Sequence, residues 1–201
     1  MPTHRLAVAA MAALPAVAFA QPCDPTQLFT PPVPYDVGGL PLAVVMGDLD
    51  GDGDNDLVVA NTANDDISVL LNDGTGALAL EVRYAVGSEP VAVALADLDG
   101  DSDNDLVIAN STGEDVSVLL NNGDATFAPD VLYGLTDRPT SLALGDLDGD
   151  GDHDLAAAVD AIGTGVVSVR LNNGDATFAP EMTYAAGQQQ EAIELGDQDG
   201  E

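Results

Sequence analysis

Short apolar segments separated by turn residues run along most of the chain. One stretch holds four of them, at 131–133, 141–144, 155–159 and 166–171, and Asn172-Asn173-Gly174 follows the last. Segments this short between turn signals are typical of β-strands, and none keeps an apolar period of 3.6 residues over three turns. We therefore expect strands joined by tight turns, almost no helix beyond the N-terminal region, and positive φ angles in the Asn-Asn-Gly turn.

The strand pattern belongs to a repeat about 49 residues long. Acidic runs begin at Asp48, Asp97 and Asp146, which are 49 residues apart. A fourth run opens at Asp197 after a spacing of 51, because the stretch 163–165 carries a two-residue insertion. Other residue types also recur at equivalent positions of the repeat, here called columns, so the repeat does not arise by chance. These columns are Phe29, Leu78, Phe127 and Phe178; Tyr35, Tyr84, Tyr133 and Tyr184; and Pro41, Pro90 and Pro139.

Four short strands in a repeat of this length match one blade of a β-propeller. We therefore predict an all-β fold of propeller blades, each a four-stranded antiparallel sheet. The blade units are placed at 29–77, 78–126 and 127–177, with a truncated fourth at 178–201. Because closed propellers use about four to eight blades, three and a half repeats predict part of a larger, seven-bladed type of propeller. Two copies that pair to complete a ring are the alternative.

The acidic run is a candidate calcium loop. It places side-chain oxygens at positions 1, 3, 5 and 9, leaves the backbone carbonyl of position 7 free, and puts a glycine at position 6 in two of three copies. Such a set of oxygen ligands suits Ca²⁺, whereas Mg²⁺ needs tighter octahedral geometry and Zn²⁺ favours Cys or His. The predicted side-chain ligands are Asp48, Asp50, Asp52 and Asp56; Asp97, Asp99, Asp101 and Asp105; and Asp146, Asp148, Asp150 and Asp154. Asp54, Asp103 and Asp152 are assigned through their carbonyls, and Asp197 and Asp199 open the fourth loop.

Two other interpretations of the loops are weaker. Solvated acidic turns would hold carboxylates about 5 Å apart, which repel by roughly 3 kcal/mol at an effective dielectric near 20. EF-hand and dockerin loops need an acidic twelfth residue and flanking helices. Here the twelfth residues are Val59, Ile108 and Ala157, and they lie in strand-forming segments.

The overall charge narrows the class of partners. The sequence has 35 acidic residues against 4 basic ones, which gives a net charge of −31. A protein this acidic repels phosphate, so nucleic acid and anionic membrane are poor partners and cations are favoured.

The N-terminus has the pattern of a secretory signal peptide at 1–20. His4 and Arg5 precede an apolar run, and Ala18-Phe19-Ala20 is a small-x-small cleavage pattern. The run is too short for a membrane span and contains Pro15. We therefore expect a secreted, extracellular or cell-surface protein without membrane insertion, with a linker at 21–28 before the first repeat.

The sequence offers little for catalysis. His153 is the only histidine after the signal peptide, and it occupies loop position 8. No nucleophile elbow, Cys/His pair or glycine-rich phosphate loop is present. We therefore expect that the chain is not an enzyme.

These motifs resemble the FG-GAP repeat of integrin α-subunit propellers and, more closely, its bacterial VCBS-type version. The resemblance covers 29–201 and is strongest in the acidic loops at 48–57 and 146–155, whereas the second copy carries Ser102 in place of glycine. The Phe-Gly dipeptide of the family appears as Phe127-Ala128 and Phe178-Ala179. The resemblance implies that each loop joins the first two strands of a blade and that all the calcium sites lie on one face.

The resemblance implies the fold and the bound metal more firmly than it implies a biological role. The resemblance favours an extracellular adhesion or recognition module that binds calcium and a protein or polysaccharide ligand. The alternative is a calcium-stabilised accessory domain of a larger secreted enzyme.

Overall fold

The computed structural model describes residues 33–161, 164–187 and 192–195 of the 201. In this part of the chain there are twelve strands and no helix, and thus no helix long and apolar enough to span a bilayer. All the strands belong to the compact unit Tyr35–Glu201. They are β1 (Pro41–Gly47), β2 (Asp56–Asn61), β3 (Asp66–Leu70), β4 (Val82–Ala85), β5 (Pro90–Ala96), β6 (Asp105–Asn110), β7 (Asp115–Leu119), β8 (Val131–Gly134), β9 (Pro139–Gly145), β10 (Asp154–Ala161), β11 (Thr164–Arg170) and β12 (Met182–Ala185). The predicted signal peptide and linker lie outside the described residues.

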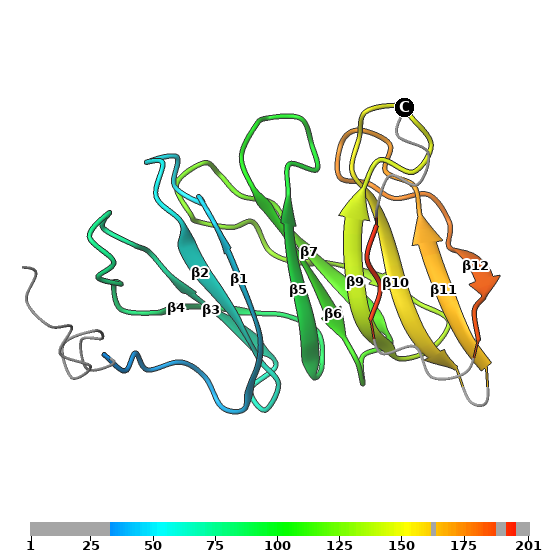
Figure 1. Ribbon diagram of the computed structural model, residues 1–201, viewed down its shortest axis with the longest axis horizontal. Coiled ribbons are helices and arrows are strands. Elements are labelled where there is room, and N and C mark those ends of the chain that lie inside the picture. Colours follow the sequence, from blue (N-terminus) through cyan, green and yellow to red (C-terminus); the bar gives the residue numbers. More distant parts are fainter. Residues whose placement is uncertain (1–32, 162–163, 188–191, 196–201) are drawn as a thin grey trace, which may run out of the picture. The chain divides into compact units, whose positions relative to one another are not determined.

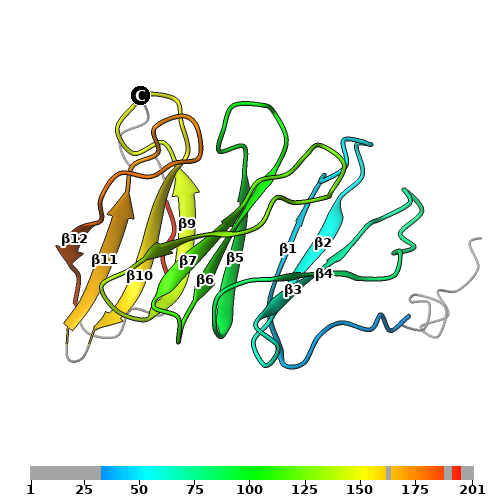
Figure 2. The same cartoon turned by 180° about the vertical axis from the view of Figure 1, so that it is seen from behind.

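The strands form three four-stranded sheets, each an antiparallel meander in chain order. The sheets are β1–β4, β5–β8 and β9–β12 (Figure 1), and Figure 2 shows the same succession from behind. The first strands of neighbouring sheets, β1, β5 and β9, lie against one another. The predicted all-β fold of four-stranded antiparallel blades is confirmed.

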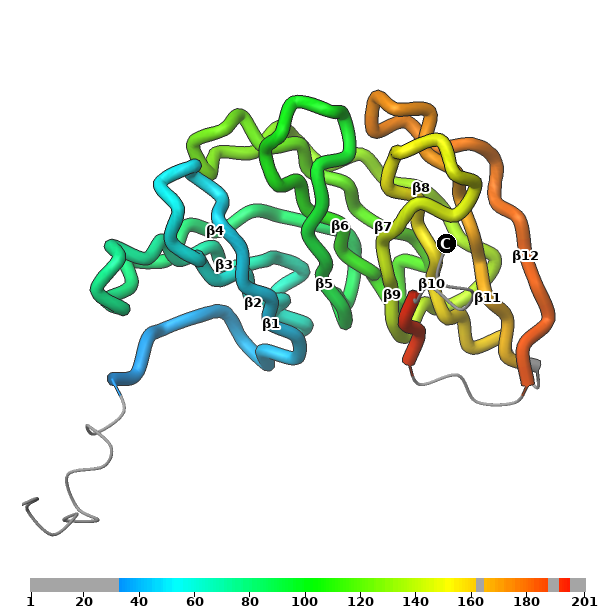
Figure 3. Tube along the Cα trace, turned by 45° about the horizontal axis from the view of Figure 1, so that its top comes forward, coloured from blue at the N-terminus to red at the C-terminus, as the bar shows by residue number. Residues whose placement is uncertain are grey.

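The sheets are offset from the repeat units defined on the sequence. The segment 131–133 is the first apolar segment of the third repeat unit, but it belongs to β8, which pairs with β7 in the second sheet. Each sheet therefore takes its fourth strand from the start of the following unit. The segment 192–195 lies beside β9 (Figure 3), and the Ile193 N–H donates to Ser141 Oγ at 3.2 Å.

The proline column marks the start of the first strand in each sheet. Pro41, Pro90 and Pro139 are the first residues of β1, β5 and β9. Proline has no N–H to donate to a ladder, so the first residue of a strand is one of the few places that a sheet accepts it. The β1–β2 and β5–β6 pairings shift register right after this proline, so the regular ladder begins beyond it.

The core lies between the sheets, and the middle sheet is covered on both faces. Every residue of β6 is buried. Its side chains alternate, so that Leu106 and Ile108 pack with the first sheet while Val107 and Ala109 pack with the third. Burial on both faces explains why this strand is a continuous apolar run instead of an alternating one.

The aromatic columns of the repeat meet between neighbouring sheets. Tyr84 contacts Phe127 edge to face with ring centroids 5.1 Å apart, and Tyr133 contacts Phe178 in the same way at 5.2 Å. The Tyr84 hydroxyl also donates to the Ala125 carbonyl at 3.2 Å. Each tyrosine therefore links its own sheet to the next one, which explains the recurrence of these two columns.

Candidate metal centre

The three acidic loops connect the first two strands of each sheet. They lie between β1 and β2, β5 and β6, and β9 and β10, and Figure 1 shows them at the same end of the sheets. The connection between the first two strands of a sheet, which the family resemblance implies for each loop, is therefore confirmed. Strands, not helices, flank each loop, so the EF-hand interpretation fails in the structure as well.

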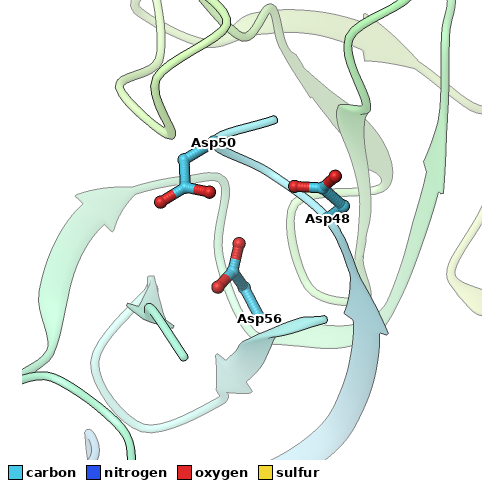
Figure 4. Close-up of side chains that lie close together, drawn as sticks. All are labelled: Asp48, Asp50 and Asp56. Atoms are coloured by element: carbon cyan, nitrogen blue, oxygen red, sulfur yellow. The ribbon is translucent and has the colours of Figure 1, made fainter. Parts of the chain in front are cut away.

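Carboxylates converge in each loop. In the first loop Asp48, Asp50 and Asp56 each offer one oxygen, and these oxygens lie within 4.8 Å of one another. Figure 4 shows the three side chains turned toward a common space, with Asp56 reaching it from the start of β2. The third loop brings together the equivalent residues, Asp146, Asp148 and Asp154. The second loop brings together Asp97, Asp99 and Asp101, which are positions 1, 3 and 5.

The remaining predicted ligands are placed differently. Asp52 and Asp150, at position 5, are outside the groups that converge, and so is Asp105 at position 9 of the second loop. The side chain at position 7 lies against a turn glycine of the same sheet: a Cβ on Gly123 would meet Asp103 Oδ2 at 2.6 Å. This placement is compatible with ligation through the carbonyl of position 7. Asp197 and Asp199 lie outside the described residues.

Position 9 is held by the backbone. Asp56 is fully buried, and its two carboxylate oxygens accept the N–H groups of Leu49 at 2.9 Å and Asn72 at 2.8 Å. Asp105 and Asp154 make the equivalent pairs of hydrogen bonds. Two backbone N–H groups thus orient the position-9 carboxylate in each sheet.

Position 1 organises the turn. Asp48 accepts the N–H groups of Gly51 at 2.8 Å and Gly53 at 3.0 Å. The second loop keeps both bonds, with the Ser102 N–H on Asp97 Oδ2 at 2.9 Å. Ser102 adopts a φ of +77°, a left-handed conformation that glycine accepts without strain and serine does not. The loop keeps its shape and the backbone at Ser102 is strained.

Burial and mutual repulsion act on the clustered carboxylates. Burial raises the pKa of Asp50, Asp99 and Asp148, and the charges of neighbouring aspartates raise each pKa further. Burial also raises the pKa of Asp105 to about 6, against the two N–H donors that lower it. These environments disfavour negative charge on the carboxylates, so a bound cation would stabilise the ionised forms.

The donor set fits a hard cation. Every converging ligand atom is a carboxylate oxygen, and no sulfur or imidazole takes part in the three groups. His153 is exposed at position 8 of its loop. Oxygen-only sites with several carboxylates suit Ca²⁺ better than Zn²⁺.

Reasoning from sequence missed three asparagines. The pattern along the chain assigns Asn172 only to a turn and does not single out its equivalents Asn72 and Asn121, but the backbone N–H of each donates to the position-9 aspartate of its own sheet at 2.8 Å. In the turn itself Gly174 has a positive φ as predicted, whereas the second positive φ belongs to Ala176 and not to an asparagine. The recurrence of asparagine sixteen or eighteen residues after the aspartate was the available signal.

Comparisons with solved structures place the fold among known ones. A structure of BBS1N in complex with ARL6DN matches over 81% of this chain with 14% identity and a TM-score of 0.55. A lectin from Agrocybe aegerita that recognises non-reducing terminal N-acetylglucosamine matches over 70% with 26% identity and a TM-score of 0.49. The chain spans 49% and 37% of the length of these two solved chains. No curated protein matches the sequence.

The sequence model of the FG-GAP-like repeat matches this chain twice, at residues 48–108 and 97–157. Each match begins at the first aspartate of an acidic loop and runs through the next loop into the strand that follows it. Together the two matches cover more than half of the chain. This chain belongs to the FG-GAP-like repeat family.

Proposed function

We propose that this chain is a secreted, calcium-binding recognition module, in which each acidic loop holds one Ca²⁺ between the first two strands of a blade. The observation that carries the proposal is the recurrence of one construction in three sheets: a turn wound around position 1 and a buried aspartate at position 9 that two N–H groups hold in place.

Charge and donor chemistry support calcium. Positions 1 and 3 converge in all three loops. The carbonyl of position 7 and water would complete the six to eight oxygen ligands that Ca²⁺ takes. With a net charge of −31, the folded chain also gains from any bound cation by reduced self-repulsion.

A recognition role, without catalysis, is the second part of the proposal. It rests on the predicted signal peptide and on the sequence inventory, in which His153 is the one imidazole beyond that peptide. An extracellular protein or polysaccharide is the proposed ligand. Repeated sheets with loops at one end offer an extended surface for such a ligand.

Calorimetric titration of the full chain with CaCl₂ tests the metal sites. Replacing Asp148 with Ala should lower the calcium stoichiometry by about one, because it removes one ligand from a loop that has its glycine at position 6. Asp36→Asn is the control, since it removes one charge from an exposed residue outside the loops. Unchanged stoichiometry in the Asp148 variant would refute the site.

Secretion and recognition need their own measurements. N-terminal sequencing of protein from the culture medium should begin near Gln21. Arrays of extracellular matrix proteins and polysaccharides, probed in calcium and in chelator, should show binding that depends on calcium. Retention inside the cell, or array binding that is equal in both buffers, would contradict the corresponding part of the proposal.

A further inference from the structure

Asn121 lies between two neighbouring acidic loops and makes hydrogen bonds to both. Its backbone N–H donates to Asp105 Oδ1, at position 9 of the second loop, at 2.8 Å. Its side-chain amide donates to the Leu49 carbonyl, at position 2 of the first loop, at 2.8 Å. The residue is only 4% exposed. One buried residue therefore connects the position-9 aspartate of the second loop with position 2 of the first loop.

Two further donors from the second sheet reach the first loop. The Ala125 N–H donates to the Leu49 carbonyl at 3.0 Å, and Asn104 Nδ2 donates to the Asp48 carbonyl at 2.9 Å. Asn104 is itself position 8 of the second loop. Positions 1 and 2 of the first loop are thus held by three donors from the sheet that carries the second loop.

The same connection joins the second and third loops. Asn172 donates its N–H to Asp154 Oδ1 at 2.8 Å and its side-chain amide to the Leu98 carbonyl at 2.8 Å. The Ala176 N–H donates to the same carbonyl at 3.0 Å. His153 occupies the position of Asn104, and among the described hydrogen bonds its side chain makes none to the second loop, so this connection has two donors.

We propose that Asn121 and Asn172 couple neighbouring cation sites, so that a Ca²⁺ ion bound in one loop raises the affinity of the adjacent loop. This inference rests on the proposed calcium function. A cation held by Asp48 and Asp50 also orders Leu49, which lies between them, and fixes the carbonyl that Asn121 needs. An ordered Asn121 in turn fixes Asp105. Part of the entropic cost of ordering the second loop has then already been offset when the second cation binds.

Electrostatic repulsion between the two bound cations opposes this coupling. It is screened over about 8 Å at physiological ionic strength, and each ion is surrounded by the carboxylates that bind it. The hydrogen-bonded connection is buried and is not screened by salt. We therefore expect positive coupling of at least about fivefold in affinity at physiological ionic strength.

The coupling factor comes from three calorimetric titrations with CaCl₂ on the full chain. One variant keeps loops 1 and 2, one keeps loop 1 alone, and one keeps loop 2 alone. The overall association constant of the first variant, divided by the product of the two single-loop constants, is the coupling factor. Loops are switched off by Asp→Asn at positions 1 and 3, which removes the charge and keeps one side-chain oxygen as a hydrogen-bond acceptor at each position. The changed residues are Asp48 and Asp50, Asp97 and Asp99, Asp146 and Asp148, and, in every background, Asp197 and Asp199.

Asn121→Ala should reduce the coupling factor from at least about fivefold to less than about twofold. Asn72→Ala is the matched control, because among the described residues its side-chain amide donates to the Asn55 carbonyl of its own loop, at 3.1 Å, and to no neighbouring loop. Asn172→Ala is a second control, because the Asn172 side chain connects loops 2 and 3 and not loops 1 and 2. Both controls should leave the coupling of loops 1 and 2 unchanged. If Asn121→Ala does not fold, Asn104→Ala removes the partly buried donor to the Asp48 carbonyl from the same connection and should lower the coupling factor by about half or more.

The outcomes separate the two proposals. Calcium binding with a coupling factor of one or less leaves the proposed function intact and overturns the coupling. A coupling factor that is equally reduced by Asn72→Ala and by Asn121→Ala would show a general loss of stability, and also overturns it. Absence of calcium binding in the chain with all loops intact overturns the proposed function and this inference together.

Discussion

Ser102 should be a source of strain that glycine removes. Its φ is +77°, while the equivalent residues Gly53 and Gly151 have φ angles of +91° and +98°. A Cβ added at either glycine would meet no atom within 4 Å. A side chain at this position therefore destabilises the fold through the backbone conformation it must adopt, and not through steric overlap with neighbouring atoms.

The magnitude follows from two opposing effects. A left-handed conformation costs an L-residue about 1 to 2 kcal/mol. Glycine loses more conformational freedom on folding than serine does, and this loss offsets roughly 0.4 to 1 kcal/mol of the gain from removing the strain. The position-6 N–H keeps its bond to position 1 with either residue, at 2.9 Å in the second loop and 3.0 Å in the first. Ser102→Gly should therefore raise the free energy of unfolding by about 1 kcal/mol, and Gly53→Ser should lower it by a similar amount.

Urea unfolding in the presence of chelator measures both variants without a contribution from bound cations. Gly151→Ser provides a third comparison at the equivalent position of another sheet. In calcium, the second loop should be the weakest site of the three by calorimetry, and Ser102→Gly should bring it closer to the others. A loss of stability in Ser102→Gly, together with no change in Gly53→Ser, would refute the reasoning from backbone strain.

Three other predictions concern metal, turn and core. At about 10 mM calcium, sites with dissociation constants of about 10⁻⁴ to 10⁻³ M should each stabilise the fold by about 1.4 to 2.7 kcal/mol; equal melting midpoints in calcium and chelator would contradict this. Gly123→Ala should destabilise the fold by about 1 kcal/mol more than Gly76→Ala, because a Cβ at Gly123 meets Asp103 whereas one at Gly76 meets nothing within 4 Å; in urea unfolding, Asp103→Ala should abolish the difference. Phe127→Ala should cost about 3 to 5 kcal/mol, since this buried ring packs edge to face on Tyr84; a loss below about 1 kcal/mol by the same assay would show that the contact between sheets contributes little.

The strands and the chemistry of the loops follow from the order of residues along the chain. Apolar segments of a few residues between turn signals predicted the strands correctly, because burial on a sheet face and turn conformation are local requirements that residue types reveal. The spacing of aspartates within a single loop likewise predicted the convergence of positions 1 and 3. These features depend on residues that are close along the chain.

How the repeats connect depends on contacts between sheets that are far apart in the sequence. A repeat has no natural start in sequence, so the assignment of 131–133 to the second sheet emerged only from its pairing with β7. The contact of Asn121 with Leu49 joins residues 72 positions apart, and no local pattern requires it. The reason is physical: equivalent residues in each repeat have the same local preferences, and the packing of one sheet on the next selects which carbonyl each asparagine meets.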